Sequence, residues 1–281
     1  PLMLTNLLQV LFNMADSAVI GPFAGALSLG AVGSTTTLVT LFTGVLIGMA
    51  GGINVLVARY FGARDKTSTV HTIHTALLVS LITGIIVLAF GMIFSKGILE
   101  IMNTKEELLN GAVLYIRIYF LGMPALALYN FGNAVCSAFG DTKKPLYYLS
   151  AAGVVNVVLN LFFVIVCKMD VAGVATASII SQYLSAFLIL RALAKMGGDY
   201  ALRLSELKFD KRMAKYIIQI GLPAGLQNGI FQLANLFIQA GVNTFDATMV
   251  AGNSAAANAD ALLYDSMAAF YTACGSFMGQ N

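Results

Sequence analysis

The sequence predicts an all-α, polytopic membrane protein. Of its 281 residues, 58% are hydrophobic and only 10% are charged, and the mean hydropathy is +0.83, whereas soluble domains carry about 25% charged residues. Apolar runs recur along the chain with polar loops between them, and their length of about 20 residues is what a helix needs to cross a bilayer. Because hydrocarbon offers no partner to unpaired backbone groups, we expect these runs to be helices.

Eight apolar stretches are candidate membrane helices, at roughly 1–22, 33–57, 71–94, 112–138, 146–167, 172–194, 216–242 and 251–278. If they alternate across the membrane, the loops after the second, fourth and sixth stretches share one side. These loops carry 12 of the 16 basic residues: Arg59, Arg64, Lys66, Lys143, Lys144, Arg191, Lys195, Arg203, Lys208, Lys211, Arg212 and Lys215. The positive-inside rule therefore predicts an inner (plasma) membrane protein with these loops and the N-terminal end in the cytoplasm.

The polar segment from Arg191 to Lys215 is the longest of the chain, and it contains Gly197, Gly198 and an amphipathic basic stretch. This composition is typical of a linker that lies on an anionic cytoplasmic leaflet. We therefore expect a six-helix lobe at 1–195, a linker at 196–215 and the start of a second lobe at 216–281. A weak repeat supports this division, because at one constant offset Pro1, Leu4, Asn6 and Asn13 match Pro223, Leu226, Asn228 and Asn235.

Six helices per unit, an even number, make the repeat a parallel one. A second unit as long as the first needs about four more helices beyond Asn281. We therefore expect the chain to be a truncated form of a two-lobe protein, ending after about eight helices.

Asp16 is the strongest functional signal in the sequence. It lies inside the first stretch, where a charge costs at least ~2.5 kcal/mol by insertion scales, so such residues usually face a cavity or a partner. Asn13 lies three residues earlier and shares its helical face. In the fifth stretch, Asn156 and Asn160 are four residues apart and adjacent on one face, where two amide oxygens can share a hard cation with a carboxylate.

Further polar residues lie in four of the predicted helices. The fourth offers Asn130 and Asn133, and the sixth offers Thr176, Ser178 and Ser181. The seventh carries a stripe that suits the wall of a wet substrate cavity, made of Asn228, Gln232, Asn235 and Gln239. In the eighth, Asp265 is a second protonatable group if it lies at membrane depth. Each amide or hydroxyl can equally hydrogen-bond helices together.

Several other functions are disfavoured by the sequence. It has no glycine-rich phosphate loop, nucleophile elbow or metalloprotease motif, so an ion gradient is a simpler energy source than ATP. The three cysteines are isolated, and the basic residues are not interleaved with aromatics as in nucleic-acid-binding proteins. We expect no cofactor and no metal other than Na⁺ at the cation site.

Three stretches carry a family resemblance: Met-Ala-Asp-Ser-Ala-Val-Ile-Gly at 14–21, Gly-Asp-Thr-Lys-Lys-Pro at 140–145, and Gly-Leu-Pro-Ala-Gly-Leu-Gln at 221–227 with Val-Ala-Gly-Asn at 250–253. In their order and spacing they resemble the multidrug and toxic compound extrusion (MATE) family. The resemblance implies two six-helix lobes that export amphipathic, often cationic, organic compounds in exchange for H⁺ or Na⁺. We expect such a protein to be a monomer and not an enzyme.

The resemblance also implies roles for individual residues. Asp16 is similar to the family's cation-binding carboxylate, and its partners correspond to Asn133, Asn156, Asn160 and Ser178. Some members have an Asp at the position of Asn160 and a Glu near Gln232, and neither acid is present here. This departure places the expected cation site in the N-terminal lobe.

Two alternatives stay open. A flippase for lipid-linked saccharide precursors has a related architecture, but it requires a wide cationic cavity, and few Lys or Arg residues lie inside the predicted helices. A membrane-embedded enzyme could use Asp16 and Asp265 as catalytic acids, but it requires paired acids or a His on facing helices.

Overall fold

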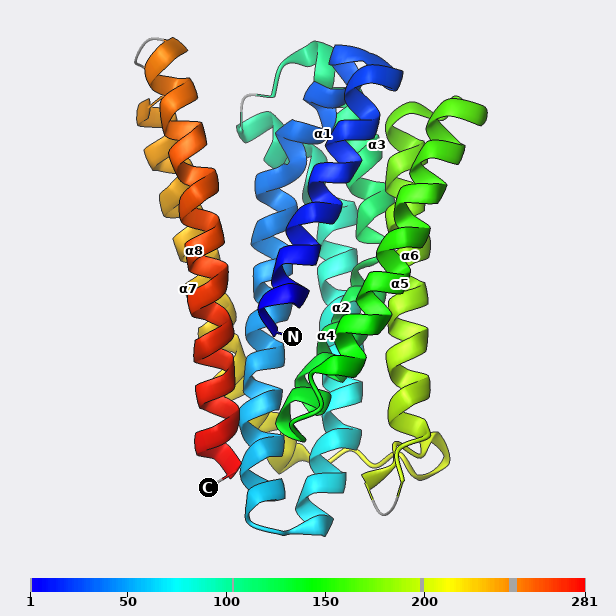
Figure 1. Cartoon of the computed structure of the whole chain (residues 1–281), viewed down its shortest axis with the longest axis vertical. Helices are drawn as coiled ribbons and strands as arrows, with labels where there is room; N and C mark the ends of the chain where they lie inside the picture. The colour runs from blue at the N-terminus through cyan, green and yellow to red at the C-terminus, as the bar shows by residue number, and fades with distance from the viewer. Residues whose placement is uncertain (1, 103, 198–199, 243–246, 281) are drawn as a thin grey trace.

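The computed structural model describes residues 2–102, 104–197, 200–242 and 247–280, and every regular element in these ranges is a helix. The elements are α1 (Leu2–Gly62), α2 (Lys66–Ile101), α3 (Glu106–Phe120), α4 (Met123–Ala138), α5 (Lys143–Leu161), η1 (Phe162–Val166), α6 (Asp170–Ala194), η3 (Leu204–Glu206), α7 (Lys211–Val242) and α8 (Ala247–Gln280). Figure 1 shows an elongated bundle with α7 and α8 at one edge and α5 and α6 at the other. The predicted all-helical fold is confirmed.

Within the described residues, four helical segments are long and apolar enough to cross a membrane: 27–62, 66–101, 143–166 and 170–194. Counting α3 and α4 as one span bent by 46° makes five. Helices α7 and α8 contain 32 and 34 residues, which also exceeds the length of a crossing. Each of the eight predicted stretches coincides with helix over most of its length.

The first two stretches differ from the prediction because no extended loop separates them. Both lie in α1, which runs to one end of the bundle and returns (Figure 1). The reversal is made at Gly25, with φ 86° and ψ 171°. This backbone conformation is essentially restricted to glycine, because any Cβ strains it. One glycine therefore replaces the longer loop that we expected.

The fourth stretch also differs, because a break separates α3 from α4 where we expected one helix. Pro124 has no N–H, and its ring excludes the carbonyl four residues earlier, that of Phe120. The side-chain amide of Gln182 in α6 occupies the space that a Cβ at Gly122 needs. The bend is therefore fixed by proline at the start of α4 and filled by a side chain from α6.

An aromatic cluster confirms that the three basic loops lie at the same end of the bundle. Phe61 from the end of α1 and Phe139 after α4 have ring centroids 4.7 Å apart, and each ring lies 5.6 Å from Tyr200 in the segment after α6. We call this end, with residues 59–66, 139–144, 191–197 and 200–215, the basic end. It lies at the bottom of Figure 1.

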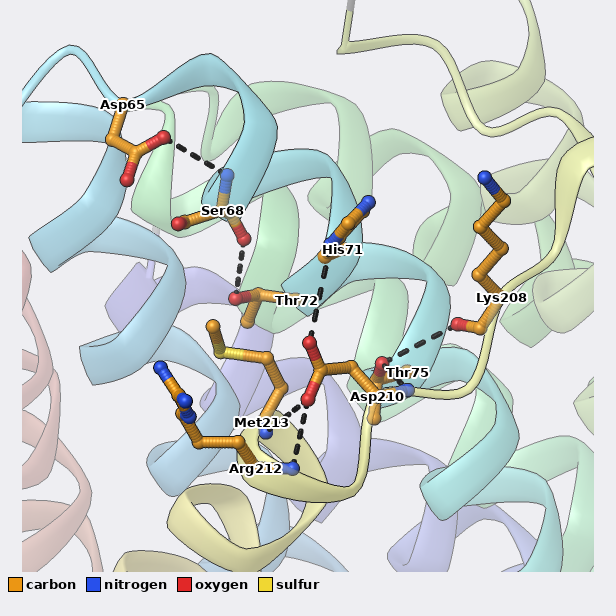
Figure 2. A network of polar contacts seen from close by, with 9 residues as sticks. All are labelled: Asp65, Ser68, His71, Thr72, Thr75, Lys208, Asp210, Arg212 and Met213. Carbon is orange, nitrogen blue, oxygen red and sulfur yellow. Dashed lines mark hydrogen bonds and ion pairs between the residues drawn. The ribbon is translucent and has the colours of Figure 1, made fainter.

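Asp210 caps the start of α7 at the basic end (Figure 2). Its Oδ1 accepts hydrogen bonds from the backbone N–H groups of Arg212 and Met213, at 2.8 and 3.2 Å. An aspartate in this position satisfies orphan donors of the first helical turn. Its other oxygen, Oδ2, lies 3.9 Å from Nδ1 of His71 in α2, so the same side chain starts one helix and faces another.

Thr75 holds the segment before α7 against α2. Its Oγ1 accepts a hydrogen bond of 3.1 Å from the Asp210 backbone N–H and donates one of 3.4 Å to the Lys208 carbonyl. Both contacts are drawn in Figure 2. Because Thr75 is fully buried, losing its hydroxyl leaves these backbone groups without their partner, which typically costs about 1–3 kcal/mol for a buried group.

Replacing Thr75 with Val should therefore loosen residues 203–212. Trypsin cleaves after Lys and Arg, and this segment contains Arg203, Lys208, Lys211 and Arg212. We expect faster tryptic cleavage there in Thr75→Val than in the wild type, measured by mass spectrometry of the fragments. Thr72→Val is the matched control, because Thr72 is equally buried but its hydroxyl donates only to Ser68 of its own helix. Equal cleavage rates in the two variants would contradict the assignment.

Glycines allow α1 and α7 to touch backbone to backbone. A Cβ at Gly52 would lie 2.7 Å from the backbone nitrogen of Gly221, and a Cβ at Gly48 would collide with the backbone of Gly225. Small residues at such crossings let membrane helices approach closely. Asn228 adds a hydrogen bond of 3.3 Å from its Nδ2 to the Gly44 carbonyl. We call this contact the glycine seam.

Gly48→Ala should separate the two helices at the glycine seam. Overpacking of a tight contact costs typically about 1–3 kcal/mol, so we expect a lower Tm in a detergent-solubilised thermal unfolding assay. Gly51→Ala is the control, because a Cβ there meets no atom within 4 Å. A Tm for Gly48→Ala equal to that of Gly51→Ala would show that the seam tolerates the added methyl group.

Candidate cation site

Three polar side chains meet inside the bundle between α5 and α6. Asn156, Asn160 and Ser178 are exposed by only 4%, 0% and 5%. Asn160 Nδ2 donates to Asn156 Oδ1 at 3.2 Å, and Asn156 Nδ2 donates to Ser178 Oγ at 3.4 Å, near the outer limit of a hydrogen bond. The structure thus brings together three of the five residues predicted to bind a cation.

The helices place this group by spacing and by packing. Asn156 and Asn160 lie one turn apart in α5, and Ser178 lies in α6, which packs along α5. The hydroxyls of Thr176 and Ser181 donate to carbonyls of α6 itself, so Ser178 is the one that meets the amides. Immediately after α5, η1 forms a single turn of π-helix, a feature that occurs frequently at functional sites.

The two amides of α4 have different surroundings. Asn130 is buried, and its Nδ2 donates to the Leu126 carbonyl one turn earlier at 3.0 Å. Asn133 is half-buried, and its Oδ1 is a buried acceptor with no hydrogen-bond partner among the described residues. The role of Asn133 at the cation site therefore stays a prediction.

Several predicted site residues have side chains that fall outside the described part of the structure. These are Asp16, Asn13, Gln239 and Asp265. The helical backbone of α1 and α8 includes Asp16 and Asp265, as the sequence predicted. Their contacts with other side chains stay predictions.

The amide stripe of α7 serves at least partly to join helices. Asn228 donates to α1 in the glycine seam, as described above. Gln232 is half-buried and Asn235 is exposed. A role for this stripe in a substrate cavity stays a prediction. The contact of Asn228 supports the alternative interpretation, in which these amides hydrogen-bond neighbouring helices together.

Asn54 is a buried polar residue that the sequence analysis did not single out. Its Nδ2 donates to the Ala134 carbonyl of α4 at 3.0 Å, and its Oδ1 accepts from the Ser276 hydroxyl of α8 at 3.0 Å. It therefore joins α1, α4 and α8. In the sequence, the feature that could have indicated Asn54 is a single amide within the apolar stretch 33–57.

The group formed by Asn156, Asn160 and Ser178 is neutral but rich in oxygen. Amide and hydroxyl oxygens are ligands for hard cations such as Na⁺, and they are most effective beside a carboxylate that supplies charge. Among the described residues, no group of three or more His, Cys, Asp or Glu side chains is placed to hold a metal ion. The group thus offers the kinds of oxygen ligand that suit a monovalent cation or a protonated carboxyl group, and cation binding here stays a prediction.

Helices long enough to cross a membrane, with polar side chains gathered in the bundle interior, are the features of a multi-pass membrane protein. Comparison with known proteins identifies the family. Residues 1–162 match the MatE family, and the chain belongs to this family of transporters, the MATE proteins, which are not enzymes.

Similar proteins agree with this assignment. The probable multidrug resistance protein YpnP of Bacillus subtilis is 32% identical over 287 aligned positions, which cover all of this chain and 63% of that protein. A crystal structure of MATE in the bent conformation matches the whole chain with a TM-score of 0.89 at 23% identity, over 64% of its own length. A MOP superfamily transporter from Pyrococcus furiosus gives 0.88 at 23% identity, over 63%. The chain thus spans less than two thirds of these proteins and has the fold of their N-terminal part.

Removing the Asn156 amide should destabilise the contact between α5 and α6. Asn156 makes one hydrogen bond across to α6, with Ser178, while its bond with Asn160 lies within α5. Hydrogen bonds between membrane helices average about 0.6 kcal/mol each, so the loss of this one predicts a cost of about that size. We expect Asn156→Ala to lower Tm more than Asn130→Ala, because Asn130 is equally buried but bonds within its own helix. Equal losses of Tm would mean that the inter-helix bond contributes nothing beyond packing.

Proposed function

We propose that the full-length gene product exports amphipathic, often cationic, organic compounds in exchange for H⁺ or Na⁺. The observation that carries this proposal is the buried chain of contacts from Asn160 through Asn156 to Ser178. Membership of the MATE family supports it, as does the likeness to a probable multidrug resistance protein. The coupling ion and the substrates are part of the proposal.

In this mechanism Asp16 supplies the charge that the three neutral side chains lack. Asp16 is the only acidic residue of α1, and an intramembrane carboxylate requires a counter-charge or a proton. Either H⁺ on Asp16, or Na⁺ held by Asp16 with Asn156, Asn160 and Ser178, neutralises it. Asn133 is a further ligand in this proposal.

Neutralisation of Asp16 changes the interactions of the first segment of α1 and so favours one of two conformations of the lobe. Drug and cation bind preferentially to different conformations, and each therefore lowers the affinity for the other. Release of the proton or Na⁺ on the cytoplasmic side returns the carrier to the drug-binding state. The exchange follows from this difference in affinity.

The proposed orientation places the basic end in the cytoplasm. The loops gathered there carry most of the basic residues of the chain, and positively charged loops are retained on the cytoplasmic side. In this arrangement the protein is a monomer of the inner membrane, with lobes at 1–195 and from 216 onward joined by the linker at 196–215.

Asp16→Asn should abolish coupled efflux while the protein stays folded. We would measure ethidium efflux from vesicles containing the full-length gene product, with a pH gradient and a Na⁺ gradient imposed separately. Coupling energies of about 1–3 kcal/mol predict a loss of at least about fivefold. The gradient that drives the wild type identifies the ion.

Asp260→Asn is the control for this experiment, because it removes a carboxylate from an exposed position in α8. It should retain wild-type efflux. Undiminished gradient-driven efflux by Asp16→Asn would contradict the proposed role of Asp16. Absence of gradient-driven dye efflux in the wild type would indicate another class of substrate.

A further inference from the structure

A cavity of about 490 Å³ lies at the basic end, between the first turns of α5 and the last turns of α6. This volume falls in the range of about 300–1,000 Å³ that is usual for ligand sites. Three of its lining residues are cationic: Lys144, Arg191 and Lys195. No lining residue is acidic. The cavity is therefore suited to an anion.

Two of the three cations are available for a ligand. Lys144 Nζ pairs with Asp141 Oδ2 at 2.7 Å. Burial raises the pKa of Asp141, but hydrogen bonds from the Lys144 side chain and backbone outweigh it and hold the pKa below its usual value, so Asp141 is ionised at neutral pH. Arg191 and Lys195 are exposed, and neither forms an ion pair with any other residue that the structure describes.

The rest of the cavity lining is largely apolar, and an exposed apolar side chain lies beside it on α6. Leu188, Ala192 and Met196 line it together with Tyr148. One turn before Arg191, Phe187 is 60% exposed on α6, and neighbours four residues apart share a helical face. A ligand that fits this site carries a negative charge at one end and hydrocarbon at the other.

We propose that this cavity binds the phosphate headgroup of an anionic phospholipid, with Arg191 and Lys195 as its main contacts. Basic pockets between membrane helices at the cytoplasmic surface are suited to such headgroups. Arginine matches phosphate geometry with two parallel N–H donors, and lysine adds a point charge. The acyl chains then lie along the apolar surface beside Leu188, and Tyr148 lies at the level of the headgroup, as aromatic residues at membrane interfaces do.

This site is distinct from the cation site and does not depend on the transport proposal. Its position at the end of α6 and the start of the linker places a bound lipid where the two lobes are connected. The Leu202 backbone N–H donates to the Leu193 carbonyl of α6 at 3.1 Å, so the chain folds back beside the cavity after Gly197. Loss of dye efflux would leave the lipid proposal unaffected.

The test uses the full-length gene product, purified in detergent and titrated with defined lipids, with binding measured by native mass spectrometry. We expect phosphatidylglycerol to be retained and phosphatidylcholine to be lost. Arg191→Gln with Lys195→Gln should weaken phosphatidylglycerol binding roughly 30-fold, from the loss of two cations near the headgroup. Arg191→Lys, which keeps the charge, should retain most of the binding and shows that the site tolerates substitution.

Arg59→Gln with Lys208→Gln is the charge-matched control, because both residues are exposed at the basic end and neither lines the cavity. This variant should bind phosphatidylglycerol as the wild type does. Equal weakening in both double variants would overturn the proposal in favour of general surface attraction. Inorganic phosphate that displaces the lipid at similar concentration would overturn it in favour of a soluble-anion site.

Discussion

Hydrocarbon provides no hydrogen-bonding partner, and this constraint governs where polar side chains lie in the structure. In the described helices many hydroxyls bond to their own backbone, as Thr40, Thr83 and Thr176 do by donating to the carbonyl four residues earlier. Amides that instead reach another helix mark the junctions of the bundle. Asn54 joins α1 to α4, Asn156 joins α5 to α6, and Asn228 joins α7 to α1. These amides therefore help to determine which helices lie next to each other, which apolar packing alone does not determine.

The sequence predicted the helices well because hydropathy reports the solvent of each segment directly. It also predicted that Asn156, Asn160 and Ser178 meet, since two of them share a helical face and the family resemblance supplied the third. It did not predict the reversal at Gly25 or the break before Pro124. A glycine or proline in an apolar segment is compatible with a straight, kinked or broken helix until its neighbours are known. Asn54 was missed because a single amide gives no pattern.

The glycine seam shows how one helix can serve two parts of the protein. Helix α1 packs against α2, α3 and α4, and it also carries most of the contact with α7 and α8. Glycines at 48 and 52 make this second contact possible without displacing the first, because they bring the α7 backbone close on one face only. The predicted lobes are divided at the linker, but the principal physical contact across that division is made by α1.

This arrangement limits how the proposed cation site can influence the second part of the chain. In the described residues, α5 and α6 pack on α1 and α4, and neither packs extensively on α7 or α8. A change at Asn156 and Asn160 therefore reaches α7 and α8 indirectly, and the shortest routes run through α1 or α4. Asn54 connects both routes, since it bonds to α4 and to Ser276 in α8, and Gln280 bonds to the Ala138 carbonyl at the end of α4. Because an amide satisfied on both sides is costly to break in hydrocarbon, these bonds hold α1, α4 and α8 to one another.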